Sequence, residues 1–387
     1  MRSYHIIRIG LWLSASLLAH LLAMGNANIQ AQTNNSPASL QAQTADLAGY
    51  VVSKLKHFDL LMIGERHWTK EEPLFLQEVL RRCHEQCPIQ YLFLEFGQFE
   101  DQAKVERFLR APRFDPAPII EILQNGDSLG WGYQEYFDIF KLVHDLNHSR
   151  PADRGIEIVL VNGAPDDVSL WPLLQKKYVG QSPRSREFTE PMVGELNDAM
   201  TDRDRFMADV IELHLLGAGT PSKGIYFAGS YHVQKCLTQK DYGHHRRYLA
   251  TGGLLDRSYP GRVFGVALQL PGYFWQDRAP QKALEQLYAD TGKPFAFDTA
   301  NSSLGQLKLA NRLVKDGVPL SQAFDGYIIL NSETNYHRCT MMPEVYTDEF
   351  AKRAWPALQR EIGPVDAEPS GKAMMRIVEE ARSESHR

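Results

Sequence analysis

The sequence predicts an α/β fold with three layers, in which a mostly parallel sheet lies between helices on both of its faces. Short apolar runs alternate with longer segments whose apolar residues recur at helical spacing. This alternation is typical of parallel strands connected by helices. Several of the runs end at ionisable residues, and open α/β sheets carry their ligand sites at these carboxyl ends of the strands. The sequence therefore predicts both the architecture and the edge at which chemistry takes place.

The expected strands follow directly from the apolar runs. They cover residues 58–64, 91–95, 156–163, 225–229, 263–270, 294–298 and 327–330. Strands buried on both faces have such short, continuous apolar stretches, because helices cover both sides of a parallel sheet.

Helices are expected between these strands. Thr69–Glu72 has the form of a capping box, and the helix that follows should run to about Gln86, before Pro88. Residues 101–109 and 136–146 also repeat apolar positions at helical spacing, and prolines between them mark a break. Residues 165–191 are polar and a long helix is expected over 193–216, so the region 165–215 is interpreted as a helical insertion.

The chain of 387 residues divides into four parts. Residues 1–27 have the basic start, the apolar stretch and the small terminal residues of a signal peptide. Residues 28–46 are rich in small polar residues and predict a flexible leader. Residues 47–347 are expected to form one α/β domain, and residues 348–387 a C-terminal helix with a charged, frayed tail.

The N-terminal segment predicts export. The apolar stretch from Leu11 to Met24 is shorter than the roughly 20 residues of a bilayer span, which favours cleavage over an uncleaved anchor. No later segment is long and apolar enough to cross a membrane. We therefore expect a periplasmic or secreted protein without stable membrane insertion. The net charge of −5 provides no basic excess and argues against nucleic acid as a partner.

Four cysteines, Cys83, Cys87, Cys236 and Cys339, favour disulfides in an exported protein. Cys83 and Cys87 flank the end of one expected helix. Cys236 and Cys339 each follow an expected strand, so the preferred pairing is Cys83–Cys87 and Cys236–Cys339. A zinc site formed by all four thiols is the alternative, although only one close pair is present and its spacing is unusual for zinc.

Ionisable residues follow three separate strands. Glu65 and His67 come directly after the first strand, Glu95 ends the second, and His232 follows Gly229-Ser230 at the end of another. Glu65 and His67 point to the same side of an extended segment because they are two residues apart. Structural roles as a helix cap, a salt bridge or a histidine bonded to a carbonyl are the alternatives. Convergence at one sheet edge favours a catalytic or metal site.

Arg203 is a further candidate residue for this predicted site. It lies on the helical stripe of Met207 and Val210, and an arginine on an apolar face needs a buried partner. We expect it to contact Glu95 or Glu65, or to bind an anionic group of the substrate. Asp204 and Arg205 are expected on the solvated face of the same helix.

The chain resembles the superfamily of erythromycin esterase-like hydrolases, ChaN-like haem-uptake proteins, and the TraB and Tiki proteins. The resemblance rests on the order of short motifs: Gly64-Glu65-Arg66-His67, Glu95, the helix of residues 203–208, Gly229-Ser230-Tyr231-His232-Val233, and the late strand of residues 324–330. One residue separates Glu65 from His67, where the esterases have two, and this spacing is more similar to the ChaN branch. The resemblance implies an α/β core with helices on both faces.

The resemblance implies two classes of function. The first is a hydrolase of ester or peptide bonds, with His67, Glu65, Glu95 and His232 as catalytic residues and Arg203 and Arg66 as substrate-binding or orienting residues. In a metal-assisted variant, His67, His232 and Glu95 hold a divalent cation. The second is a haem- or metal-binding protein without turnover, which needs an exposed axial ligand beside an apolar surface. The expected partner is a small-molecule or peptide substrate.

Overall fold

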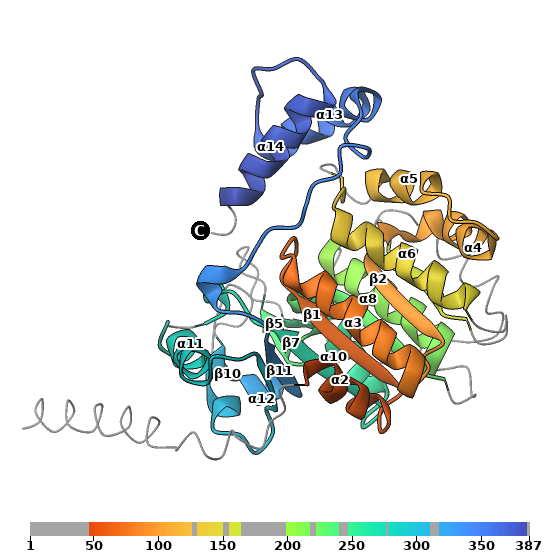
Figure 1. Cartoon of the computed structure of the whole chain (residues 1–387). Helices are drawn as coiled ribbons and strands as arrows, with labels where there is room; N and C mark the ends of the chain where they lie inside the picture. Colours follow the sequence, from red (N-terminus) through yellow and green to blue (C-terminus); the bar gives the residue numbers. More distant parts are fainter. Residues whose placement is uncertain are drawn as a thin grey trace, which may run out of the picture.

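The computed structural model describes eight stretches of the chain (Figure 1), namely residues 46–125, 130–149, 155–163, 199–216, 222–239, 247–275, 278–309 and 317–384. The expected signal peptide, nearly all of the leader and residues 165–198 of the expected insertion lie outside these ranges.

A seven-stranded sheet in the order β3-β2-β4-β1-β7-β11-β8 forms the centre of the molecule. Its strands are β1 (Leu60–Glu65), β2 (Tyr91–Gln98), β3 (Glu157–Asn162), β4 (Gly224–Gly229), β7 (Val263–Leu268), β8 (Phe295–Asp298) and β11 (Gly326–Ile329). All neighbouring pairs are parallel except β11 and β8. Two short antiparallel pairs lie outside it: β5 (Leu237–Gln239) with β6 (Arg247–Leu249), and β9 (Lys308–Leu309) with β10 (Val318–Pro319). The predicted α/β class and its mostly parallel sheet are confirmed.

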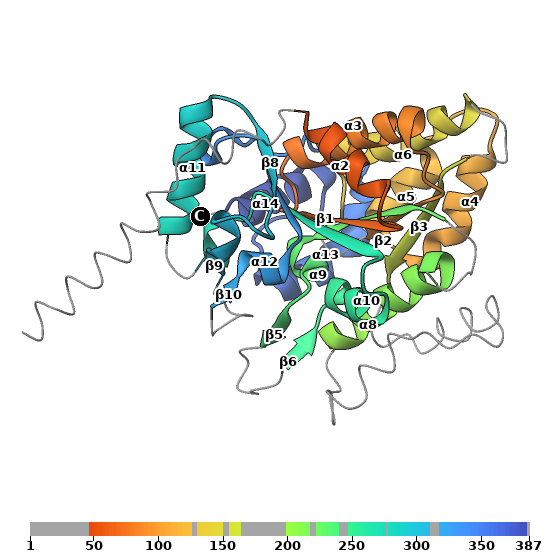
Figure 2. The same cartoon turned by 90° about the horizontal axis from the view of Figure 1, so that it is seen from below.

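Helices cover both faces of the sheet (Figure 2). One layer consists of α2 (Leu47–Leu55), α3 (Glu71–Gln86), α4 (Gln102–Arg110), α5 (Ala117–Asn125) and α6 (Gln134–His148). The opposite layer includes α8 (Ala199–Ile211), with a π-helical turn over Glu212–Leu216, α10 (Thr251–Ser258), α11 (Ala279–Thr291) and α12 (Leu320–Ala323). Strand residues alternate between the layers: Leu61 and Ile63 of β1 face the first, whereas Leu60 and Met62 face the second.

The C-terminal part differs from the expected single helix with a frayed tail. It forms two helices, α13 (Asp348–Ile362) and α14 (Gly371–Glu384), which contact each other. Met374 and Val378 of α14 are fully buried in the core of the first layer, together with Leu358 of α13. The spacing of Met374 and Val378 creates an apolar stripe, and burial of that stripe explains why this segment is ordered.

The expected disulfides are absent, and the prediction is wrong in this structure: Cys83, Cys87, Cys236 and Cys339 are all buried free thiols. Cys236 belongs to the core of one sheet face and Cys339 to the core of the other, so the sheet separates them. Cys83 and Cys87 lie one helical turn apart, and the backbone N–H of Cys87 donates to the carbonyl of Cys83.

Among the described helices, none combines the length and the apolar character of a membrane span.

Candidate functional site

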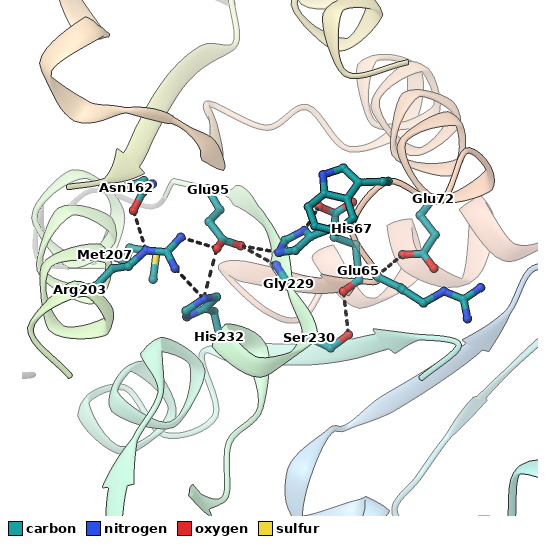
Figure 3. A network of polar contacts seen from close by, with 12 residues as sticks. Glu65, His67, Glu72, Glu95, Asn162, Arg203, Met207, Gly229, Ser230 and His232 are labelled. Atoms are coloured by element: carbon teal, nitrogen blue, oxygen red, sulfur yellow. Dashed lines mark hydrogen bonds and ion pairs between the residues drawn. The ribbon is translucent and has the colours of Figure 1, made fainter. Parts of the chain in front are cut away.

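The carboxyl ends of four adjacent strands form one polar site (Figure 3). Glu65 ends β1, Asn162 ends β3, and Gly229 ends β4 directly before α9 (Ser230–Val233), which carries His232. Glu95 lies where β2 leaves its regular register with β3, between Leu94 and Gln98. Such an irregularity redirects side chains at a strand end. All four residues that the sequence placed at strand ends, Glu65, His67, Glu95 and His232, therefore meet at this edge.

Glu65 and His67 form a pair that orients the imidazole. Oε1 of Glu65 is 2.8 Å from Nδ1 of His67, and Oε2 accepts a 2.6 Å hydrogen bond from the hydroxyl of Tyr136. A carboxylate accepts from Nδ1–H, which assigns the lone pair of the neutral ring to Nε2. Glu65 is buried, whereas the side chain of His67 is 29% exposed. The pair thus holds a basic nitrogen at a point that solvent reaches.

Glu95 lies at the centre of the polar contacts of the site. Its Oε1 accepts from Nη2 of Arg203 at 2.6 Å and lies 3.2 Å from Nε2 of His232. Its Oε2 accepts a 2.6 Å hydrogen bond from the backbone N–H of Gly229. Because one carboxylate collects two cationic partners and a backbone donor, its charge is neutralised although the residue is buried. The predicted contact of Arg203 with Glu95 is present.

Gly229 lies next to the gap between the side chains of His67 and Glu95. Nε2 of His67 and Oε2 of Glu95 are 3.9 Å apart, too far for a direct hydrogen bond. A Cβ atom at position 229 would lie 2.8 Å from Nε2 of His67 and 3.5 Å from Oε2 of Glu95. Only glycine therefore leaves this gap open.

His232 is held as a cation between two carboxylates. Its Nδ1 is 2.8 Å from Oδ1 of Asp204, which also accepts from the backbone N–H and the hydroxyl of Thr251 at 2.9 and 2.7 Å. Burial opposes the charge, but Asp204 and Glu95 outweigh it and raise the pKa of His232 from 6.5 to about 10. The imidazolium therefore persists at neutral pH.

The same charges shift the other two groups. Burial alone would raise the pKa of Glu95, but the positive charges of His232 and Arg203 hold it well below its usual range. Burial also opposes the charge on His67, yet the hydrogen bond to Glu65 and the charge of Glu95 raise its pKa above 6.5. His67 is thus a stronger base than a free histidine.

Replacing Asp204 with asparagine should lower the pKa of His232 from about 10 toward its ordinary 6.5, because one carboxylate is lost while the burial remains. An NMR titration of the histidine ring measures this pKa. Asp290→Asn, on the exposed surface of α11, is the matched control. A pKa of His232 unchanged by Asp204→Asn would contradict the proposed charge balance.

The expectation for Asp204 was wrong. It was expected on a solvated helical face, but it is 1% exposed and contacts His232. Its spacing to Ala208 and Ile211, both fully buried, was a helical signal that could have revealed this. Asn162, whose Oδ1 accepts a 2.7 Å hydrogen bond from Nε of Arg203, could have been found as a polar residue at a strand end.

Arg66 does not join this site, and its expected role in binding or orienting a substrate there is not supported by its position. Its Nη1 donates to Glu333 at 2.7 Å, and its guanidinium lies 4.7 Å above the ring of Tyr336. The backbone N–H of Arg66 donates to Glu72. Because adjacent residues in an extended segment point to opposite sides, Arg66 faces away from Glu65 and His67.

The expected divalent-metal set of His67, His232 and Glu95 does not fit a metal. Across the described ranges, no group of three or more His, Cys, Asp or Glu residues is arranged to hold an ion. Both ring nitrogens of His232 face carboxylates: Nε2 lies 3.2 Å from Oε1 of Glu95, and Nδ1 lies 2.8 Å from Oδ1 of Asp204. Because both nitrogens are engaged in this way, neither directs a lone pair toward a metal site.

Aromatic side chains surround the imidazole of His67. His67 has Trp68 and Trp131 as ring neighbours, at centroid distances of 5.8 and 5.0 Å. Within the part of the chain that the structure describes, Leu74 and Ile362 are the only large hydrophobic side chains that are exposed.

No family model and no curated protein matches the chain. Solved structures do match. A succinoglycan biosynthesis protein has 11% identity and a TM-score of 0.55 over 78% of this chain and 93% of its own. A Bacillus cereus protein has 10% identity and a TM-score of 0.51 over 77% of this chain and 94% of its own. A mutant of erythromycin esterase EreC in its open conformation has 13% identity and a TM-score of 0.50 over 75% of this chain and 94% of its own.

The chain has the fold of erythromycin esterase. The fold that the resemblance implies is thereby confirmed. A haem-binding ChaN of Campylobacter jejuni also matches, with 13% identity and a TM-score of 0.39 over 73% of this chain and 92% of its own, which is too low a score to support an argument. Because all these identities are low, the similarity describes the backbone, and the chemistry has to be argued from the side chains of this chain.

Proposed function

We propose that the protein is a hydrolase of ester or peptide bonds, in which neutral His67 activates water. The observation that carries the proposal is the Glu65–His67 pair: Glu65 occupies Nδ1 at 2.8 Å, and Nε2 has no hydrogen-bond partner among the described residues. This arrangement of carboxylate, imidazole and open nitrogen is that of a general base.

In the proposed reaction, a water molecule at the gap between His67 and Glu95 attacks the carbonyl carbon of the substrate. Nε2 of His67 takes the proton, and the carboxylates of Glu65 and Glu95 stabilise the imidazolium that forms. Arg203, whose side chain is 24% exposed, contacts the other oxygen of Glu95 and offers N–H donors to the developing oxyanion. His67 then returns the proton to the leaving group. His232 and Arg203 together keep Glu95 in place.

The fold supports the proposal, since an esterase shares it, but the substrate has to be found by experiment. The test is a screen of the mature protein against ester and peptide libraries, with and without a chelator. We expect turnover that the chelator does not remove, because the donor set does not fit a metal. A Soret band in the purified protein, together with no turnover on any compound, would instead support the haem-binding alternative.

The activity should depend on pH through His67. Only the neutral ring accepts a proton, and the pKa of His67 is raised, so kcat/KM should increase with pH through an apparent pKa above 6.5. At high pH, His232 loses its proton. Its contribution to the free energy of unfolding is complete below pH 6.5 and is lost as the pH increases through about 10. A pH profile measured together with thermal unfolding tests both limbs. An acid limb at or below 6.5 would argue against His67 as the base.

We also propose export, with cleavage after Ala27. The basis is the sequence of the first 27 residues. N-terminal sequencing of the protein recovered from a periplasmic or culture fraction should begin at Asn28. Recovery of the uncleaved chain in the membrane fraction would contradict this.

A further inference from the structure

The loop that carries His67 is held by the C-terminal part of the chain. Residues 337–342 run between this loop and the start of α6, and make backbone contacts to both. The N–H of Lys70 donates to the carbonyl of His337, and the N–H of Cys339 to the carbonyl of Trp68. On the other side, the N–H of Gln134 donates to the carbonyl of Thr340. Figure 1 shows this extended segment running toward α13.

Trp68, the residue after His67, has a strained backbone. Its φ of 64° lies in the left-handed region, which is rare for bulky residues. Such strain persists only where the surrounding structure enforces it. One restraint is local to the site: the N–H of Trp68 donates to the hydroxyl of Tyr136 at 3.2 Å, and the same hydroxyl donates to Glu65. The conformation of Trp68 and the Glu65–His67 pair are therefore linked.

Arg382 of α14 supplies a further restraint. Its guanidinium lies 4.2 Å from the centre of the Trp68 ring and 5.9 Å from that of Trp131. It donates to the hydroxyl of Tyr133 and, at 3.0 Å, to the carbonyl of Gly130. Arg382 is only 3% exposed, so this is a buried cation placed against aromatic faces. Arg338 in turn donates to the carbonyls of Glu379 and Arg382 near the end of α14.

The two tryptophans that contact Arg382 also contact His67. The His67 ring packs edge-on against Trp131 with an interplanar angle of 85° and a centroid distance of 5.0 Å, and it lies 5.8 Å from the Trp68 ring. The two indoles are 5.8 Å apart. A continuous path of ring contacts thus connects α14 to the imidazole.

We propose that Arg382 is a positioning residue, which fixes the orientation of the His67 ring through Trp68 and Trp131. The proposal rests on the proposed function of His67, and it makes the C-terminal helix part of the catalytic scaffold. A base displaced by about 1 Å loses on the order of 100-fold in rate. The residue that fixes its ring should therefore affect kcat much more than KM.

The test compares Arg382→Met with Arg376→Met, an exposed position on the same helix. The first readout is the NMR resonance of the His67 ring proton on Cε1, assigned by its loss in His67→Ala. Because the imidazole packs against the Trp131 ring, the resonance should be displaced in the wild type and should move in Arg382→Met only. The second readout is kcat, expected to fall about 10- to 100-fold with KM within about twofold.

Two further variants separate positioning from general stability. Arg382→Lys keeps the charge over the rings but cannot donate to Tyr133 and Gly130 as a planar fork, so both readouts should be intermediate. Tyr133→Phe removes one partner of Arg382 and should shift both readouts in the same direction by less. If Arg382→Met does not fold, these two variants decide the proposal.

A folded Arg382→Met with the wild-type His67 resonance and the kcat of the Arg376→Met control would overturn the proposal. So would wild-type readouts in both Arg382→Lys and Tyr133→Phe. If the wild-type protein hydrolyses no compound in the screen, the proposed function fails, but the His67 resonance still decides whether Arg382 positions this ring.

Discussion

Replacing His67 with alanine is expected to lower kcat/KM on an ester or peptide substrate by about 100- to 10,000-fold, the usual contribution of a positioned general base. The physical reason is that Nε2 of His67 is the basic nitrogen which the Glu65 pair directs toward solvent. The fold should be retained, because the side chain is 29% exposed and its loss leaves no large cavity. Steady-state kinetics and thermal unfolding measure the two quantities.

His57→Ala is the matched control, since His57 is an exposed histidine near the end of α2 and away from the strand ends. Its turnover should equal that of the wild type. Full activity of His67→Ala on an identified substrate would remove His67 from the mechanism, and His67 would then be a structural partner of Glu65 alone.

Replacing Glu95 with glutamine is expected to reduce the free energy of unfolding by about 3–5 kcal/mol, the range for breaking a buried ion pair from one side. Glutamine has nearly the same shape, so the change isolates the charge. Without the carboxylate, Arg203 and the imidazolium of His232 are left 3.4 Å apart with no negative group between them. Urea unfolding near pH 7 measures the change in free energy.

Glu78→Gln, on the exposed face of α3, is the control for this substitution. Its ion pair with Arg82 is 3.9 Å long, and the Glu78 side chain is 52% exposed. Loss of this pair should therefore change the free energy of unfolding by less than about 1 kcal/mol. If Glu95→Gln is as stable as Glu78→Gln, the charges at the site are balanced by something other than Glu95.

The strands and the strand-end chemistry could be predicted from the sequence, because both follow from local patterns. A strand covered on both faces needs a continuous apolar run, and a run such as residues 60–63 has no other stable position in this fold. Parallel strands place their carboxyl ends at one edge. Glu65, Glu95 and His232 were therefore expected at one edge, and the adjacency of β2, β4 and β1 in the sheet brings them together.

The apolar stripe of α8 predicts the inward orientation of Arg203. The inward orientation of its neighbour Asp204 was not predicted. Arg203 and Asp204 both contribute to the site, one through Glu95 and the other through His232. Asp204 was expected to face solvent because it is charged and follows the inward-facing Arg203. Ala208 and Ile211 lie at helical spacing from Asp204 and are apolar, which indicates that Asp204 also faces the core.

The sequence by itself determined the α/β class, the order of the strands along the chain and the edge at which the acidic and basic residues gather. Only the tertiary structure decided which side chains contact each other. It paired Tyr136 with Glu65, directed Arg66 to Glu333, separated Cys236 from Cys339 on opposite faces and placed Arg382 beside the His67 loop. The physical reason is that periodicity fixes the face on which a residue lies, whereas its partner depends on how distant elements pack.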